Sequence, residues 1–219
     1  PHRPPPLHLA PSLDRTTDWL ARCTAAHQRP DDQALFGIVQ GGASSELRRH
    51  SARETAALGF DGYAHGGLGL GEDAARRSEL IAVANEELPP AAPRYLMGIG
   101  RPQDLVDGIA AGIDMFDCVL PTRLARHGTV LTTGGRLNLR NARFARDDLP
   151  LDPAFPASPA ARWSRAYLRH LLMTDEPTGR RLLTLHNLAW LLDFVDRLRA
   201  AIDEGRFEAF RTETLAVWG

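Results

Sequence analysis

Residues 112–123 read GIDMFDCVLPTR, a short apolar run that contains two carboxylates and ends in an arginine. The apolar side chains of residues 115–120 favour a strand that is buried on both faces. A carboxylate in such a strand costs free energy unless it is paired or used, so Asp114 and Asp117 each need a partner or a function. Asp117 stands near the carboxyl end of the predicted strand, just before Pro121, and in α/β proteins that end carries the chemistry. The spacing leaves two interpretations of Asp117 open: a functional carboxylate, or a cap of the following turn.

The composition is that of an ordinary globular protein, with 219 residues, 43% hydrophobic residues and a formal net charge of −1. A chain of this length can bury one sizeable core and a small second unit. No apolar run approaches the ~20 residues of a membrane span and no signal peptide is recognisable, so we expect no membrane partner. Cys23 and Cys118 stand alone, which excludes a CxxC metal pair and fits a reducing cytoplasm.

A run of arginines without any acidic residue extends from residue 119 to residue 146. Its members are Arg123, Arg126, Arg136, Arg140, Arg143 and Arg146. A local run of this kind suits a polyanionic partner. The solvated surface of a hairpin is an equally good interpretation of the same residues.

Strand-like and helix-like segments alternate over the first half of the chain. The Pro-rich residues 1–11 favour a linker or a ragged start, and Ser12 can cap a helix that runs to about His27. Strands are predicted at 34–39, 60–64, 94–97 and 115–120, with helices at 44–58, 73–88 and 102–111 between them. This alternation predicts a parallel sheet with right-handed crossovers. Each strand ends in glycine or a polar residue, so we expect one binding face that includes Gln40, Gly66–Gly67, Gly98 and Asp117.

The alternation stops after Arg123. Residues 129–133 and 136–140 predict a β-hairpin with a turn at Gly134–Gly135, and residues 150–162 predict an irregular loop rich in proline and alanine. Helices are expected at 164–175 and 186–203, with a short tail helix to 215. The predicted organisation is a start segment (1–11), a four-strand unit (12–122), an Arg-rich hairpin and loop (123–163) and C-terminal helices (164–219).

Several long motifs occur together and in a fixed order. They are FGIVQGG (36–42), GFDGYAHGGLGLGE (59–72), RYLMGIG (94–100), GIDMFDCVLPTR (112–123), LNLRNARF (137–144), SRAYLRHL (164–171) and HNLAWLLDFVDRLRAAIDEGRF (186–207). From about residue 12 to 210 the chain resembles the tRNA-guanine transglycosylases, also called queuine or preQ1 tRNA-ribosyltransferases. The resemblance implies the second half of a (β/α)8 TIM barrel, with four parallel strands, a β-hairpin insertion and C-terminal helices.

The resemblance also implies an activity. Enzymes of this family are pentosyltransferases of queuosine synthesis that exchange guanine at the tRNA wobble position for a 7-deazaguanine. They act on a nucleotide that has left its stack, through a covalent intermediate between an aspartate and the ribose. The expected partners are tRNA and guanine or preQ1, and the expected location is cytoplasmic. Leu70 is bulky where the queuine type is richer in glycine, which favours preQ1 or guanine as the base.

The family roles transfer to matching positions of this chain. By resemblance, Asp117 is the nucleophile, while Arg123 and Arg126 hold anticodon phosphates. The residues implied to contact the base are Gln40, the backbone of Gly67, the carbonyl of Leu68, Tyr63 and Met97. His65 stands where the family has an aliphatic residue, and a partly exposed loop histidine is a better interpretation than a new catalytic role.

The family's general base and a second guanine-reading aspartate belong to the first half of the barrel, which this sequence does not contain. Two strands, 34–39 and 115–120, are then left without neighbours on one side, and open edges invite pairing. We therefore expect a partner chain or a second copy to complete the barrel, or else a product that is not active by itself.

The zinc site of the family is also altered. Phe155, Ala157 and Ala160 occupy the positions of its three cysteines, and His186 remains as the fourth ligand. One imidazole does not make a structural zinc site, so we expect no zinc cofactor and a loop held by packing of Phe155 and Trp163. An alternative function follows from both departures: a non-catalytic tRNA-binding or subunit-partner protein, in which Asp117→Asn would leave binding intact.

Overall fold

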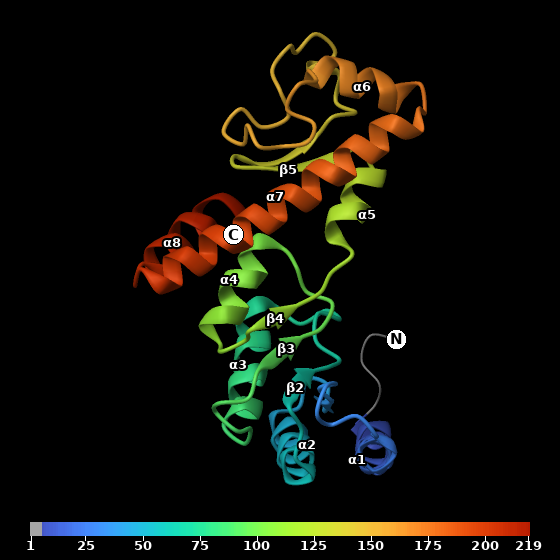
Figure 1. Ribbon diagram of the computed structural model, residues 1–219, viewed down its shortest axis with the longest axis vertical. Helices are drawn as coiled ribbons and strands as arrows, with labels where there is room; N and C mark the ends of the chain where they lie inside the picture. The colour runs from blue at the N-terminus through green and yellow to red at the C-terminus, as the bar shows by residue number, and fades with distance from the viewer. Residues whose placement is uncertain (1–5) are drawn as a thin grey trace. The chain divides into compact units, whose positions relative to one another are not determined.

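The structure is a computed structural model that describes residues 6–219. Its chain divides into two compact units. The first, the sheet unit, runs to Gly100 and continues over residues 104–118. The second, the hairpin unit, comprises residues 101–103 and 119–219. Figure 1 labels the elements of both.

The centre of the sheet unit is a sheet of four short parallel strands in the order β1-β2-β3-β4. They are β1 (Phe36–Val39), β2 (Gly62–His65), β3 (Arg94–Leu96) and β4 (Met115–Phe116). The strand order equals the chain order, so each connection crosses over to the neighbouring strand. The predicted α/β fold with four parallel strands is confirmed, and it is consistent with part of a (β/α)8 barrel.

Four helices accompany the sheet: α1 (Pro6–Ala26), α2 (Ser45–Leu58), α3 (Ala74–Asn85) and α4 (Pro102–Ala110). Two of them begin at a capping side chain. Ser44 Oγ accepts a hydrogen bond from the Leu47 N–H at 3.3 Å, and Asp73 Oδ1 accepts one from the Arg76 N–H at 2.7 Å.

The first helix begins earlier than predicted. A linker was expected over residues 1–11, but α1 begins at Pro6 and includes Pro11, so that prediction is wrong for residues 6–11. Residues 1–5 lie outside the described residues. Proline suits the first helical position, where the backbone N–H has no intrahelical partner, and Pro11 removes only one hydrogen bond from the second turn.

Side chains alternate between the two faces of the sheet, as the period of a strand requires. Helices α2, α3 and α4 lie over one face of the sheet (Figure 1). Two apolar clusters form the core on that face. Val39 and Phe116 pack into these clusters. Gln40 and Asp117 follow them directly in the chain, so their side chains point toward the opposite face.

The fourth strand is shorter and more exposed than predicted. It ends at Phe116, and α5 (Leu120–Arg126) begins where the strand was expected to continue. Pro121 causes the change, because it cannot donate to a sheet but fits the first turn of a helix. Met115 is 45% exposed and Val119 57% exposed, so the expectation of burial on both faces is wrong. Among residues 6–219, no further strand pairs with β1 or with β4.

The hairpin unit is built from a short hairpin and helices. In chain order its elements are α5, β5 (Thr129–Thr132), β6 (Gly135–Asn138), the 3-10 helix η1 (Ala142–Phe144), α6 (Arg165–Met173), α7 (Pro177–Asp203) and α8 (Phe207–Trp218). One apolar cluster joins the elements from α5 to α7, and its buried members include Val130, Leu139, Leu168 and Leu183. No helix in residues 6–219 combines the length and apolarity needed to span a membrane.

Two details of this unit correct the sequence analysis. The turn of the hairpin is Thr133–Gly134 and not Gly134–Gly135, because Gly135 pairs with Thr132 and adopts φ +101°. Helix α7 begins at Pro177 and not at His186. Leu182 and Leu183 continue the apolar stripe into its first turns, so His186 lies inside the helix.

Candidate active site

Asp117 is held at the carboxyl end of the sheet by two hydrogen bonds to one oxygen. The Tyr95 hydroxyl donates to Asp117 Oδ1 at 2.6 Å, and the Gly98 N–H donates to the same atom at 2.8 Å. These donors, the Tyr95 hydroxyl first, lower the pKa of the Asp117 carboxyl, and the carboxylate raises the pKa of Tyr95 to about 12. Neither bond uses Oδ2, so the ionised group is fixed through a single oxygen.

The two carboxylates of the 112–123 segment have different roles. Asp114 Oδ2 accepts a hydrogen bond from the Arg94 N–H at 2.8 Å and so ties β4 to the start of β3. Asp117 bonds back to the end of β3, and α5 has no side-chain cap. The alternative interpretation of Asp117 as a cap of the following turn is therefore wrong.

Gln40 lies against the glycines that follow β2. A Cβ added at Gly66 would be 2.7 Å from Gln40 Nε2, and one at Gly67 would be 3.0 Å from Gln40 Oε1. Only glycine leaves room for the amide in this position. The two strand ends that the sequence analysis assigns to the base are thus brought together, with the Gln40 side chain next to the Gly67 backbone.

Arg48 is a residue of this site that the sequence analysis missed. It is 0% exposed; its Nε donates to Gly42 O at 2.9 Å and its NH2 group to Gly66 O at 2.8 Å. Burial lowers the pKa of Arg48 to about 10, and Glu72 partly opposes that shift. One guanidinium therefore connects the loop after β1 to the loop after β2. The helical spacing could have indicated that Arg48 is buried, because it lies on the same face of α2 as the buried residues Ser51, Ala52 and Thr55.

The loop after β2 is also held from its far end. The Glu72 carboxylate accepts hydrogen bonds from the backbone N–H groups of Gly69 and Leu70, the latter at 3.1 Å. Arg77 lies beside Glu72, at 3.9 Å, and pairs with Asp104 on α4. Leu70 remains 57% exposed. The loop thus presents an apolar side chain from a backbone that is fixed at both ends.

A cavity of about 720 Å³ lies beside these strand ends, within the range usual for small-molecule sites. It is lined by three residues assigned to the base, Gln40, Gly67 and Leu68, together with Leu70 and Glu72 from the same loop. Another part of its wall is formed by α1, through Leu9, Ser12, Leu13 and Thr16.

The other residues assigned to the base lie elsewhere. Tyr63 is 1% exposed and packs in the apolar cluster under the helices, so it does not line the cavity. Met97 follows β3 and is 38% exposed. His65 is also on the helix-covered face, 0% exposed, with Nε2 3.0 Å from Asn85 Oδ1. The expected loop histidine is therefore wrong: His65 ends β2, and burial lowers its pKa to about 4.

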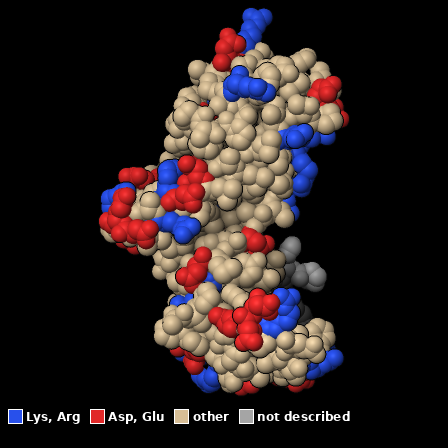
Figure 2. All heavy atoms as spheres, viewed as in Figure 1, with Lys and Arg blue, Asp and Glu red and all other residues tan. Residues whose placement is uncertain are grey.

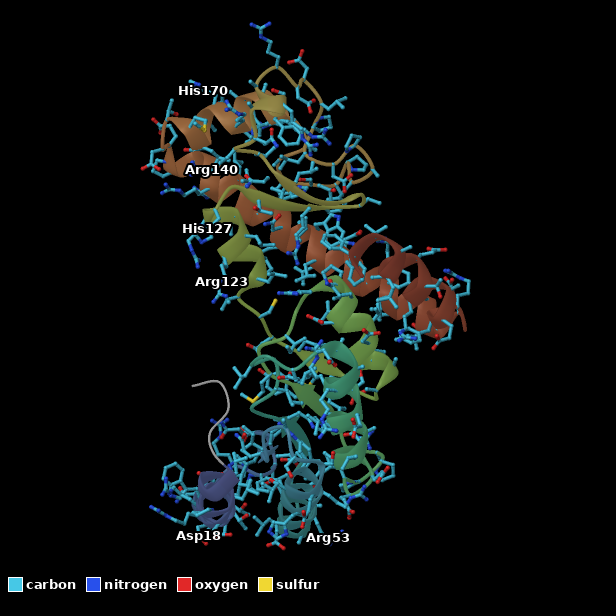
Figure 3. The ribbon with its side chains drawn as sticks, turned by 180° about the vertical axis from the view of Figure 1, so that it is seen from behind. Asp18, Arg53, Arg123, His127, Arg140 and His170 are labelled. Atoms are coloured by element: carbon cyan, nitrogen blue, oxygen red, sulfur yellow. The ribbon has the colours of Figure 1, made fainter. Side chains whose placement is uncertain are left out.

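In the hairpin unit, α5 carries exposed cations. Arg123 and Arg126 occupy the last turn of this helix, where the helix dipole favours positive charge. Figure 3 shows Arg123, His127 and Arg140 on the same side of the unit, and Figure 2 shows arginine atoms along that edge. Not all of the arginine run is free, because Arg143 lies over the Phe144 ring at 4.6 Å.

His186 and Asn187, inside α7, both form hydrogen bonds with the backbone of one residue of β5. His186 Nε2 is 2.8 Å from Leu131 O, and the Leu131 N–H donates to Asn187 Oδ1 at 2.9 Å. The Asn187 amide also donates to Pro121 O at 3.0 Å and to Thr129 O at 3.1 Å. Asn187 therefore fixes the start of the helix that carries Arg123, a role the sequence analysis missed.

The residues around His186 do not fit a zinc ion. Ser158 Oγ lies 2.7 Å from His186 Nδ1, and the Phe155 ring is 6.1 Å from the imidazole. Phe155 and Ala160 are buried side chains without a ligating atom. Over residues 6–219, no three His, Cys, Asp or Glu side chains gather in a way that could hold a metal.

Comparison with known proteins identifies the family. The family described as queuine tRNA-ribosyltransferase matches residues 4–219. Over 207 residues the chain is 51% identical to a queuine tRNA-ribosyltransferase of Symbiobacterium thermophilum, covering 94% of this chain and 52% of that protein. It is 50% identical over 212 residues to one of Bacillus cytotoxicus, covering 97% of this chain and 56% of that protein. The chain thus spans about half the length of these curated relatives, and it belongs to the queuine tRNA-ribosyltransferase family.

Proposed function

We propose that this chain carries the nucleophile and part of the base site of a tRNA-guanine transglycosylase, which exchanges guanine at the wobble position for preQ1 or guanine. The observation that carries the proposal is the fixed Asp117 carboxylate. Its Oδ1 is bonded to Tyr95 and Gly98 at the end of the sheet where α/β enzymes place their chemistry. The family membership supports the same reaction.

The reaction is a double displacement. Asp117 Oδ2 attacks the ribose C1′, an oxygen–carbon bond forms, and the bond to guanine N9 breaks. The incoming base then attacks C1′ through its own N9 and releases the carboxylate, so the proton lost by one base balances the proton gained by the other. The lowered pKa of the Asp117 carboxyl keeps it ionised, which a nucleophile requires.

Recognition of the base is assigned to the two linked loops. The Gln40 amide and the Gly67 N–H provide hydrogen-bonding groups for the edge of a purine, and the Leu68 carbonyl provides an acceptor for the incoming base. Met97, exposed after β3, supplies an apolar wall. Leu70 occupies part of the cavity wall, which favours preQ1 or guanine over the bulkier queuine.

Binding of tRNA is assigned to the exposed end of α5. Arg123 and Arg126 are free to contact phosphates, which supply most of the affinity of such complexes. Replacing Arg126 by Gln should weaken binding of every tRNA and lower the salt dependence, by a slope of about 0.7–0.9 per lost phosphate contact. Arg181→Gln, an exposed arginine of α7, is the control and should change neither quantity.

We further propose that strands from a partner chain or a second copy complete a (β/α)8 barrel against the open edges of β1 and β4. Light scattering of the purified chain distinguishes the two sources, since a dimer indicates the second copy. A strictly monomeric chain with exchange activity would contradict this part of the proposal.

Incorporation of labelled guanine into unfractionated tRNA tests the reaction. Asp117→Asn should abolish incorporation and the covalent tRNA adduct. Asp114→Asn is a matched control from the same segment, because an amide oxygen can still accept from the Arg94 N–H. Loss of exchange in both variants, or in neither, would contradict the role assigned to Asp117.

A second candidate function is a tRNA-binding or subunit-partner protein without catalysis. The open edges of β1 and β4 favour it, since a sheet of this kind is suited to pairing with another chain. Under this function the Asp117→Asn variant binds tRNA and the partner as the wild type does, and the wild type shows no exchange.

A further inference from the structure

A loop of the hairpin unit buries several of its own side chains. Residues 150–164, here called the 150–164 loop, begin and end at a bridge between Pro150 and Ser164. Phe155 and Ser158 are each 7% exposed and Ala160 is 0% exposed. Ser158 and Phe155 contact His186 of α7, and the Ala160 N–H donates to Ser158 Oγ.

We propose that the Ser158–His186 hydrogen bond closes this loop in the place where the family carries a zinc ion, so that the protein folds and remains folded without a metal. This closure of the loop does not depend on the proposed catalytic function. It concerns only residues of the hairpin unit.

The directions of the hydrogen bonds support a metal-free closure. Leu131 O can only accept, so His186 Nε2 carries the hydrogen of the neutral ring. His186 Nδ1 then has a lone pair, and the Ser158 hydroxyl donates to it at 2.7 Å. Ser158 Oγ in turn accepts from the Ala160 N–H at 3.1 Å. Each polar atom of this chain of bonds has a partner of the right kind.

The same bonds leave no place for zinc. A structural zinc ion needs four ligands in tetrahedral geometry, and a histidine binds it through a lone pair. The one lone pair of His186 is already used by Ser158. Phe155, Ala157 and Ala160 supply no sulfur, and the Phe155 ring packs at 6.1 Å from the imidazole, where it adds apolar contact in place of a ligand.

The loop is also fastened independently of His186. Asp152 is buried and accepts hydrogen bonds from the Thr133 N–H at 2.6 Å and the Thr133 hydroxyl at 2.8 Å. It accepts a third from the Ala154 N–H at 3.1 Å. The Arg165 guanidinium donates to Leu151 O at 3.1 Å. Protein groups therefore perform the cross-linking that a metal would otherwise supply.

The first test is metal content and its effect on stability. The full chain, purified from cells grown with added zinc, should contain well under 0.2 zinc per chain, and EDTA should shift its Tm by less than 1 °C. One equivalent of zinc, or a fall in Tm with EDTA that zinc reverses, would overturn the proposal.

The second test rebuilds the ligand set. The triple variant Phe155→Cys, Ala157→Cys and Ala160→Cys should bind one Co²⁺ with the absorption bands of tetrahedral thiolate coordination and show a Tm that rises with zinc. The wild type should show neither response. A folded triple variant that binds no metal would overturn the claim that Ser158 and His186 occupy the former metal position.

The third test remains informative if the triple variant does not fold. Ser158→Ala should lower the Tm by about 3–8 °C, because a buried imidazole acceptor loses its donor. Ser158→Thr keeps the hydroxyl and should recover most of that loss. An unchanged Tm in Ser158→Ala, measured with EDTA present, would show that the pair does not hold the loop.

Discussion

Replacing Arg48 by Met would separate two loops that the structure joins through one guanidinium. The change keeps a long side chain in the apolar stripe of α2 and removes both donors and the charge. Each hydrogen bond from a charged group contributes about 1.5–3 kcal/mol, so losing the bonds to Gly42 O and Gly66 O costs about 3–6 kcal/mol. These losses are not the whole effect, because the wild type buries a cation.

The burial of that cation offsets part of the loss. Burial lowers the pKa of Arg48 to about 10, and a fall of this size corresponds to about 3 kcal/mol. The variant no longer carries this cost. The expected net effect is a decrease of about 2 kcal/mol in the free energy of unfolding of the sheet unit. Arg48→Lys should lie between, since an ammonium cannot reach two carbonyls with the geometry of a guanidinium fork.

Hydrogen exchange is the appropriate assay, because two units need not unfold as one. Amides of residues 40–44 and 66–72 should exchange roughly 10-fold faster or more in Arg48→Met, as a loss of about 2 kcal/mol implies for exchange by local opening. The control is Arg49→Met on the same helix, whose ion pair with Glu86 is exposed and contributes about 0–1 kcal/mol. Equal protection of both loops in wild type and Arg48→Met would refute the bridge.

Three further predictions concern the sheet unit. Burial lowers the pKa of His65 in the folded protein to about 4, below its ordinary 6.5, so its contribution to the free energy of unfolding is full above pH 6.5 and is lost as pH falls toward 4. His65→Leu should therefore reduce the pH dependence of that free energy by up to about 3 kcal/mol, as measured by urea titrations at several pH values. Tyr95→Phe should raise the pKa of the Asp117 carboxyl, as observed by carboxyl NMR, and an unchanged titration would contradict the assigned hydrogen bond. Gly66→Ala should push the Gln40 amide aside, so guanine affinity should fall in calorimetry while circular dichroism stays the same, whereas full affinity would exclude that contact.

The parallel sheet was predictable because strand, helix and glycine signals repeat with a regular period. The failures lie where one residue suits two structures. Proline can end a strand and can also begin a helix, and the apolar residues before Pro121 are compatible with both structures. The beginning of α1 failed for the same reason, since Pro6 reads as a breaker although it fits the first turn of a helix.

The arrangement of the candidate site was predictable where a polar residue directly follows an apolar strand, as at Gln40 and Asp117. It was not predictable where a residue acts through the backbone of another segment. The bond from Tyr95 to Asp117 depends on strand pairing and on which face each side chain takes. Register also explains Tyr63, which pairs opposite Gly37 on the helix-covered face and so cannot reach the cavity.

The His186–Asn187 pair shows why a motif can point to the right residues for an incomplete reason. The resemblance assigns His186 to the family's zinc site, as the one ligand that the sequence keeps. In the structure its Nε2 and the Asn187 amide bind the carbonyl and the N–H of Leu131, so the pair fastens α7 to the hairpin whether or not a metal is present. Only Nδ1 faces the 150–164 loop, and Ser158 satisfies it. The hydrogen bond from His186 Nε2 to Leu131 O does not require a metal at Nδ1. This bond alone therefore explains why an imidazole stands at position 186.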